Sequence, residues 1–95
     1  MRVLLHAPTA DALDRARSNA RNLLAEAPDA SVEIVANAGG VAHALAAPDP
    51  TDEHLRLCAK TLARLGLDAG GQAIVAAAVL HLARRQAQGW AYIRA

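Results

Sequence analysis

The sequence predicts a single α/β domain, spanning residues 1–95, with a mostly parallel sheet. Two observations lead to this fold class. Short apolar segments of strand length alternate along the chain with longer segments whose apolar residues recur at helical spacing. Prolines and glycines separate most of these segments, and 95 residues make one small domain.

The first strand and the first helix have clear limits in the sequence. Residues 1–7 (MRVLLHA) form an apolar run that ends at Pro8, as expected for a buried strand. The next segment begins with Thr9 and Asp11, either of which can cap a helix, and Pro28 stops that helix. The apolar positions that recur at helical spacing are Leu13, Ala16, Ala20, Leu23 or Leu24, and Ala27.

The second strand is expected at residues 31–37 (SVEIVAN), where valine and isoleucine predominate. The sequence AGG then interrupts the pattern, and residues 41–47 are long enough for one or two helical turns. Residues 48–52 (PDPTD) hold two prolines and two aspartates, so we expect a turn or linker there.

The stretch HLRLCAKTL, residues 54–62, fits two different structures. The spacing of its apolar residues is compatible with one helix that begins near Thr51 and stops at Gly66. The alternation over residues 54–58 is equally compatible with a strand that is followed by a helix from Ala59. The pattern alone leaves both structures open.

The last third of the chain predicts strand, helix and strand. Residues 72–79 (QAIVAAAV) contain a short apolar strand, residues 79–88 (VLHLARRQAQ) form a helix that Gly89 caps, and residues 90–93 (WAYI) form the final strand. The residues of this helix expected to face inwards are Val79, Leu82 and Ala83.

The composition suggests a domain that gains stability by self-association. Apolar residues make up 54% of the chain, but 25 of the 95 residues are alanine, which buries little area. Only one tryptophan, one tyrosine and no phenylalanine are present. Small cores of this kind often bury further surface in an oligomer, so we expect a homo-oligomer.

Charge and hydropathy exclude several classes of function. The net charge is +1, the charges are interspersed, and aromatic residues are scarce, so the chain has neither the basic stripe nor the stacking surface of a nucleic-acid-binding protein. Its first residues resemble neither a signal peptide nor a membrane span. The single cysteine is compatible with a reducing compartment, and we expect a cytoplasmic protein with no membrane association.

Cys58 is the first candidate for chemistry. If residues 54–58 are a strand, Cys58 stands at its carboxyl end and just before the N-terminus of a helix, where ligands bind in open α/β sheets. Free N–H groups at that N-terminus favour an anion, so the thiol pKa should fall and its nucleophilicity should rise. The alternative is an inert, buried cysteine, because cysteine is among the most buried residue types.

Four further residues are candidates for ligand binding. His6 ends the first strand and would face the same edge of the sheet as Cys58, as a proton partner, a ligand contact or a histidine satisfied by a carbonyl. Asn37, Gly39 and Gly40 follow the second strand, where glycine lets N–H groups turn towards an anion, unless they form an ordinary turn. The histidines and the cysteine show no familiar metal spacing, so no metal site and no cofactor are expected.

Several other polar and aromatic residues are expected to be structural. Thr61 is expected to cap or back-bond within its helix, and Arg84 and Arg85 are expected to form a solvated helix face. Trp90 is expected to pack in the protein or in a subunit interface.

Two sequence blocks resemble those of the DsrE-like (DsrE/DsrF, YchN-fold) family of small sulfur-metabolism proteins. One is Cys-x-x-Thr-Leu at Cys58, Thr61 and Leu62, and the other is Gln-x-x-Gly-Trp-Ala-Tyr-Ile at residues 86–93. The order of the other pieces is also similar: HAP after the first strand, NLL near the end of the long helix and VANAGG after the second strand. The resemblance covers nearly the whole chain, although the segment between AGG and Cys58 is short for the family.

This resemblance implies a three-layer α/β/α domain with about five strands that associates as a trimer or hexamer. It also implies that Cys58, at the end of the third strand beside a cleft, carries sulfur as a persulfide between a donor and an acceptor protein. A different class of function also remains open, a non-catalytic oligomeric module that binds a small ligand or a protein, in which Cys58 only packs.

Overall fold

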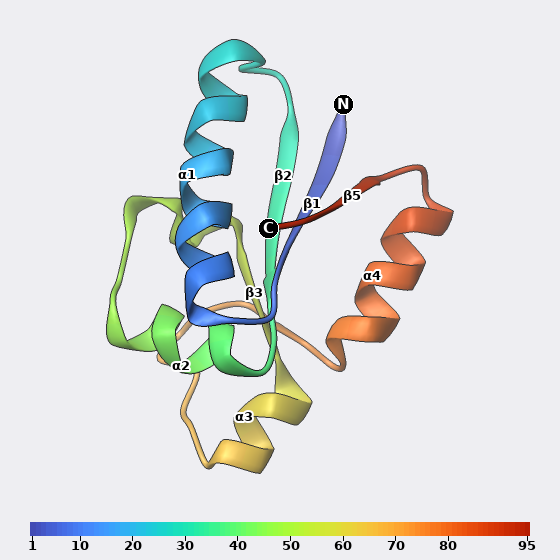
Figure 1. Ribbon diagram of the computed structural model, residues 1–95. Coiled ribbons are helices and arrows are strands. Elements are labelled where there is room, and N and C mark those ends of the chain that lie inside the picture. Colours follow the sequence, from blue (N-terminus) through green and yellow to red (C-terminus); the bar gives the residue numbers. More distant parts are fainter.

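The computed structural model describes all 95 residues and contains one five-stranded sheet. The strand order is β4-β3-β2-β1-β5, and every neighbouring pair is parallel (Figure 1). The strands are β1 (Arg2–Ala7), β2 (Ser31–Ala36), β3 (Leu55–Cys58), β4 (Ile74–Val75) and β5 (Ala91–Arg94). The helices are α1 (Ala10–Glu26), α2 (Gly39–Ala46), α3 (Ala59–Leu65) and α4 (Ala78–Ala87), with a short 3-10 helix η1 (Pro50–His54).

The helices cover the two faces of the sheet unequally. Figure 1 shows α1 and α2 on one side of the strands and α4 on the other, with α3 beyond the end of β3. This arrangement is a three-layer α/β/α fold, and it confirms the α/β fold class that the alternating sequence pattern predicts. The sheet is entirely parallel because every crossover between neighbouring strands in the chain contains a helix.

The ambiguous stretch at residues 54–62 is a strand followed by a helix. β3 ends at Cys58, which is also the N-cap of α3, and Gly66 ends that helix in the left-handed conformation with φ 63°. The strand form is selected by tertiary pairing, because β3 lies between β2 and β4 and hydrogen-bonds to both. A single helix over these residues would leave the inner edges of β2 and β4 unpaired.

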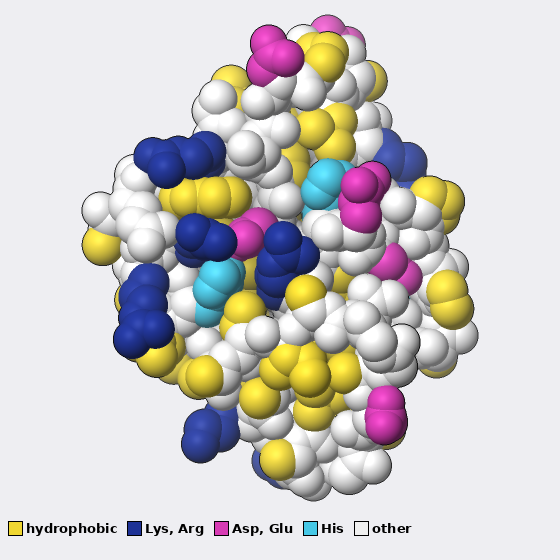
Figure 2. Space-filling view, turned by 180° about the vertical axis from the view of Figure 1, so that it is seen from behind, with side chains coloured by type: hydrophobic (Ala, Val, Ile, Leu, Met, Phe, Trp, Pro, Cys, Tyr) yellow, Lys and Arg dark blue, Asp and Glu magenta, His cyan; other side chains and the backbone are white.

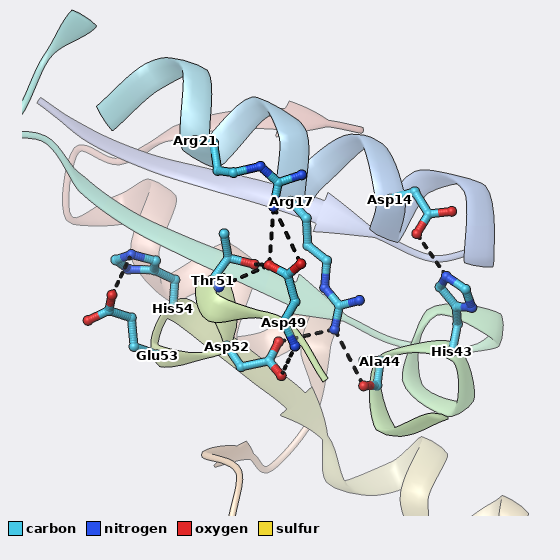
Figure 3. Close-up of polar contacts among 10 residues, drawn as sticks. All are labelled: Asp14, Arg17, Arg21, His43, Ala44, Asp49, Thr51, Asp52, Glu53 and His54. Atoms are coloured by element: carbon cyan, nitrogen blue, oxygen red, sulfur yellow. Dashed lines mark hydrogen bonds and ion pairs between the residues drawn. The ribbon is translucent and has the colours of Figure 1, made fainter. Parts of the chain in front are cut away.

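Two predictions about local structure are wrong in detail. The turn or linker expected at residues 48–52 is partly a 3-10 helix, because η1 begins at Pro50 and continues to His54, and Asp49 and Asp52 cap it reciprocally. Arg17 and Arg21 of α1 hold this segment through ion pairs to Asp52 (3.1 Å) and Asp49 (3.2 Å), as Figure 3 shows. A turn signal in the sequence does not reveal such distant partners.

Val79 and Ala83 are exposed, contrary to the prediction from helical spacing that they face inwards. Val79 is 77% exposed, whereas Ala78 and Leu82 are the buried residues of α4. The helix begins at Ala78, and its rotation about its axis is set by a polar anchor described below. The prediction that Leu82 is buried is confirmed.

The apolar core is concentrated on the α1 and α2 side of the sheet. Fifteen buried residues form one cluster there, whereas the cluster beneath α4 holds five. The members of the smaller cluster are Leu4, Val35, Cys58, Ala78 and Leu82. The α4 side therefore has less apolar packing and more room for polar chemistry.

Candidate functional site

A cavity of about 360 Å³ lies between α4, the carboxyl ends of β1 and β2, and Tyr92 of β5. It lies where the strand order reverses, because the chain crosses the sheet from β4 at one edge to β5 at the other. Ligands of open α/β sheets bind at such reversal points, outside the carboxyl ends of the strands. The lining residues are His6, Asn37, Ala78, Val79, Leu82, Ala83, Gln86 and Tyr92.

His6 is the centre of the polar wall of this cavity. Its Nε2 is 2.9 Å from Asn37 Oδ1, and its Nδ1 is 2.6 Å from the Tyr92 hydroxyl. Because Asn37 Oδ1 can only accept, Nε2 carries the hydrogen, and in the neutral imidazole Nδ1 then accepts from the hydroxyl. The structure thus brings together two of the predicted ligand-binding residues, His6 and Asn37. It adds Tyr92, for which the sequence held only a strand signal.

Gly39 and Gly40 do not line the cavity. They form the first turn of α2, and Gly40 packs against the backbone of β1 so closely that a Cβ there would be 2.1 Å from the Ala7 carbonyl oxygen. The glycine at position 40 therefore permits close packing of helix on strand. The structure does not support the expected role of the two glycines in binding an anion.

Cys58 is buried behind the cavity wall, with 5% of its surface exposed. Its sulfur accepts a hydrogen bond from the Ala78 N–H at 3.4 Å. Since Cys58 is the N-cap of α3 and Ala78 is the first residue of α4, the N-termini of two helices meet at one sulfur atom. The positive ends of both helix dipoles favour a thiolate there.

The hydrogen bonds to the sulfur outweigh the cost of its burial. Burial raises the pKa of the Cys58 thiol. Hydrogen bonds from the Ala78 N–H, the N–H and hydroxyl of Thr61, and the Lys60 N–H lower this pKa by more than burial raises it, so the pKa lies below its ordinary value. The thiol is therefore predisposed to ionise even though solvent scarcely reaches it.

Thr61 has a position that the sequence prediction did not anticipate. Its side chain is buried, and its hydroxyl oxygen accepts from the Ala38 N–H at 3.1 Å while its hydrogen is free to face the Cys58 sulfur. Ala38 is the only non-glycine residue with positive φ (47°), and it follows Asn37 directly. Thr61 therefore connects the loop that carries Asn37 with the thiol.

Glu33 anchors α4 to the sheet through buried charges. It is 4% exposed, and Arg85 donates to both of its carboxylate oxygens, at 3.2 and 3.0 Å. His81 Nε2 lies 2.7 Å from the same carboxylate, and Arg56 Nε lies 3.5 Å away. The expectation that Arg85 forms only a solvated face is wrong, because its partner is 52 positions earlier in the chain.

The anchor also determines the pKa of Glu33 and the character of this face. Burial raises the pKa of Glu33, but the hydrogen bonds from Arg85 and His81 outweigh it, so the pKa lies below its ordinary value. The Arg85 guanidinium carbon lies 4.8 Å from the centroid of the Trp90 ring. This contact confirms the prediction that Trp90 packs within the protein. Figure 2 shows Lys and Arg side chains gathered around an acidic side chain and a histidine, above a hydrophobic patch.

Neither a metal-binding cluster nor a membrane-spanning helix is present in the structure. No cluster of three or more His, Cys, Asp or Glu side chains has the geometry to hold a metal ion. None of the helices has both the length and the apolar character needed to cross a membrane.

Comparison with known proteins shows similarity to a solved structure of matching length. The chain is similar to a protein of unknown function, MTH1491 from Methanobacterium thermoautotrophicum, with 30% sequence identity and a TM-score of 0.82. The match covers 99% of this chain and 98% of the archaeal one. The chain therefore belongs to the same family as this archaeal protein. No protein-family model matches the chain, and no curated protein matches it either.

Proposed function

We propose that this chain is a DsrE-like sulfur carrier of the cytoplasm in which Cys58 accepts and donates one sulfur atom as a persulfide. The observation that carries the proposal is the environment of the Cys58 sulfur, where an Ala78 N–H donates from one helix N-terminus and a second helix begins. A thiolate is both the nucleophile and the leaving group in sulfur transfer, so an environment that favours it suits both directions.

The transfer itself requires no oxidant, reductant or cofactor. The Cys58 thiolate attacks the terminal sulfur of a persulfide donor, R–S–SH. A sulfur–sulfur bond forms to Cys58 as the bond within the donor breaks, and the donor leaves as the thiolate R–S⁻. Cys58–S–SH then passes its terminal sulfur to an acceptor thiolate by the same exchange. The chain has no second cysteine, so the persulfide has no internal thiol with which to form a disulfide.

The burial of Cys58 requires α4 to move before a protein partner can react. Ala78 and Leu82 cover the sulfur, and they are the only buried residues of α4. Gly70 and Gly71 lie in the loop before β4, and β4 is paired with β3, so the movement must take place at the first turn of α4 itself. An outward movement of this turn would break the Ala78 N–H to sulfur hydrogen bond and uncover the thiol.

A homo-oligomer, as a trimer or hexamer, forms part of the proposal. Its support is the set of large apolar side chains that the single chain leaves exposed around α4. They include Ile74 at 54%, Val79 at 77% and Leu80 at 42% exposure. A small protein seldom leaves so many exposed together without a partner.

The pH dependence of alkylation tests the state of the thiol. Iodoacetamide should modify Cys58 in the folded protein, with a rate that stays high at pH values below the ordinary cysteine pKa, because the folded-state pKa is lowered. Cys58→Ser supplies the blank, and Thr61→Val should move the profile to higher pH while Thr61→Ser restores it. Incubation with cysteine persulfide should then add one sulfur to the wild type, measured by intact mass.

Alkylation that is negligible until the protein unfolds would contradict the sulfur-carrier proposal. So would the absence of added sulfur in a protein whose thiol is alkylated at low pH. In either case the non-catalytic binding module would become the working function, with Cys58 as a packing residue.

A further inference from the structure

The cavity beside His6 is distinct from the position of the thiol. Cys58 is not among its lining residues, and Ala78 and Leu82 separate the two. Whatever occupies the cavity therefore does not have to react with sulfur. A ligand bound in this cavity is independent of whether Cys58 carries a persulfide.

The volume of the cavity limits the size of an occupant. About 360 Å³ corresponds to roughly a dozen atoms of water size, at about 30 Å³ each. This volume lies at the lower end of the range for small-molecule sites. One ring with a short polar substituent fits within this volume.

The two walls differ in polarity. The α4 wall consists of Ala78, Val79, Leu82 and Ala83, all apolar, and the two alanines leave room for a flat body. The opposite wall carries His6, Asn37 and Tyr92 from the sheet, and Gln86 adds a polar group from α4. An apolar wall facing a few fixed polar groups is the usual composition of a ligand site.

The internal hydrogen bonds determine which polar atoms remain for a ligand. Asn37 Oδ1 is engaged by His6, which leaves the amide N–H₂ of Asn37 as a donor. Gln86 Nε2 donates to the Leu82 carbonyl at 3.2 Å, which leaves its side-chain oxygen as an acceptor. The cavity thus offers a neutral donor at Asn37 and neutral acceptors at Gln86 and at the Tyr92 hydroxyl oxygen. The Asn37 donor and the Gln86 acceptor together complement a primary amide.

The lining contains no Lys, Arg, Asp or Glu. Two arginines lie near the cavity, but neither offers it a free charge. Arg85 is paired with Glu33, and Arg94 lies beside His6 in the sheet but is not part of the lining. An ionised ligand would lose its hydration and would find no free charged partner in the lining, because both ring nitrogens of His6 are already hydrogen-bonded to Tyr92 and Asn37. The walls therefore favour an uncharged ligand.

We propose that this cavity is a binding site for a small uncharged organic molecule, about one ring in size, that carries an amide-like group able to donate and accept hydrogen bonds. The ring lies against the alanines of α4, and the amide lies between Asn37 and Gln86. His6 and Tyr92 are positioning residues, because their hydrogen bonds orient the Asn37 side chain.

Benzamide and benzoate provide a matched pair of probes, since they have the same ring and differ in the charge of the substituent. Titration of the ¹⁵N-labelled protein with benzamide should shift the amide signals of His6, Asn37 and residues 78–86 in a saturable way, with Kd on the order of 1 mM for so small a ligand. Benzoate should bind at least tenfold more weakly.

Two variants of exposed alanines on α4 locate the binding. Ala83→Leu fills the cavity and should abolish the saturable shifts, whereas Ala87→Leu, which does not line the cavity, should leave them unchanged. Gln86→Leu preserves much of the side-chain volume and should weaken benzamide about tenfold. Benzamide that binds Ala83→Leu as it binds the wild type, benzoate that binds as tightly as benzamide, or an absence of saturable shifts would each overturn the proposal.

Discussion

The two faces of the sheet are held together by different forces. On the α1 and α2 face, fifteen buried apolar residues pack in one cluster, and polar contacts such as Arg17–Asp52 lie at its margin. On the α4 face, the buried cluster holds only five residues, including Cys58, and the helix is fixed mainly by Glu33 and its basic partners. The first face supplies stability, and the second leaves a thiol and a cavity under a lightly packed helix.

The largest expected difference between the two faces is in the free energy of unfolding that is lost when a buried leucine is replaced by alanine. Leu13→Ala, on the fully buried side of α1, should lower the free energy of unfolding by about 3–5 kcal/mol, because the rigid cluster cannot close the void. Leu82→Ala, beneath α4, should cost about 2 kcal/mol or less, because this face can relax. Urea unfolding of both variants measures the difference, and equal losses would show that both faces are packed alike.

Gly40→Ala tests how tightly the well-packed face is built. The added Cβ would lie 2.1 Å from the Ala7 carbonyl oxygen, so the backbone must shift, at an expected cost of about 1–3 kcal/mol. Gly39→Ala is the control, since its Cβ would meet no atom closer than 3.7 Å, and its stability should change by less than about 0.5 kcal/mol. Thermal melts distinguish them, and a neutral Gly40→Ala would mean that α2 moves freely on β1.

Glu33→Gln tests the polar anchor and its dependence on pH. At pH 7 the variant should be about 1 kcal/mol less stable, a modest loss because Arg56 and Arg85 are partly solvated. The folded-state pKa of Glu33 is lowered, so its stabilising contribution is present above the ordinary value near 4.5 and is lost as the pH falls through the folded value.

The difference in the free energy of unfolding between wild type and Glu33→Gln should therefore become smaller as the pH falls from 5 to 2.5. Urea unfolding at several pH values measures this difference. Glu53→Gln is the control, because its side chain is 77% exposed and its loss should be negligible at every pH. A gap that stays constant across this range would show that the Glu33 charge does not hold α4.

Much of the fold follows from the sequence, because the spacing of apolar residues and the positions of proline and glycine are local signals. Thr9, one of the two residues predicted to cap the first helix, is the N-cap of α1. The strands at 2–7, 31–36 and 91–94 lie where the apolar runs predict them. The expected position of His6 and Asn37 at one edge of the sheet also follows from strand polarity, since parallel strands end at the same edge.

The missed parts of the site depend on contacts between distant residues. Tyr92 reaches His6 across 86 positions, and Arg85 reaches Glu33 across 52. The exposure of Val79 and the placement of Gly40 result from the same cause, because helix rotation and close backbone packing are decided by what lies opposite. No short segment of the sequence contains both partners of such a contact, so a local pattern does not predict it.

The sequence by itself determined the α/β class, the position of most elements and the presence of a single cysteine, because these depend on composition and local periodicity. Only the tertiary structure decided that residues 55–58 are a strand, that two helix N-termini meet at the Cys58 sulfur, and that His6, Asn37 and Tyr92 share a cavity. These depend on strand pairing and on the crossing of α4 over the sheet, which exist only when the whole chain is folded.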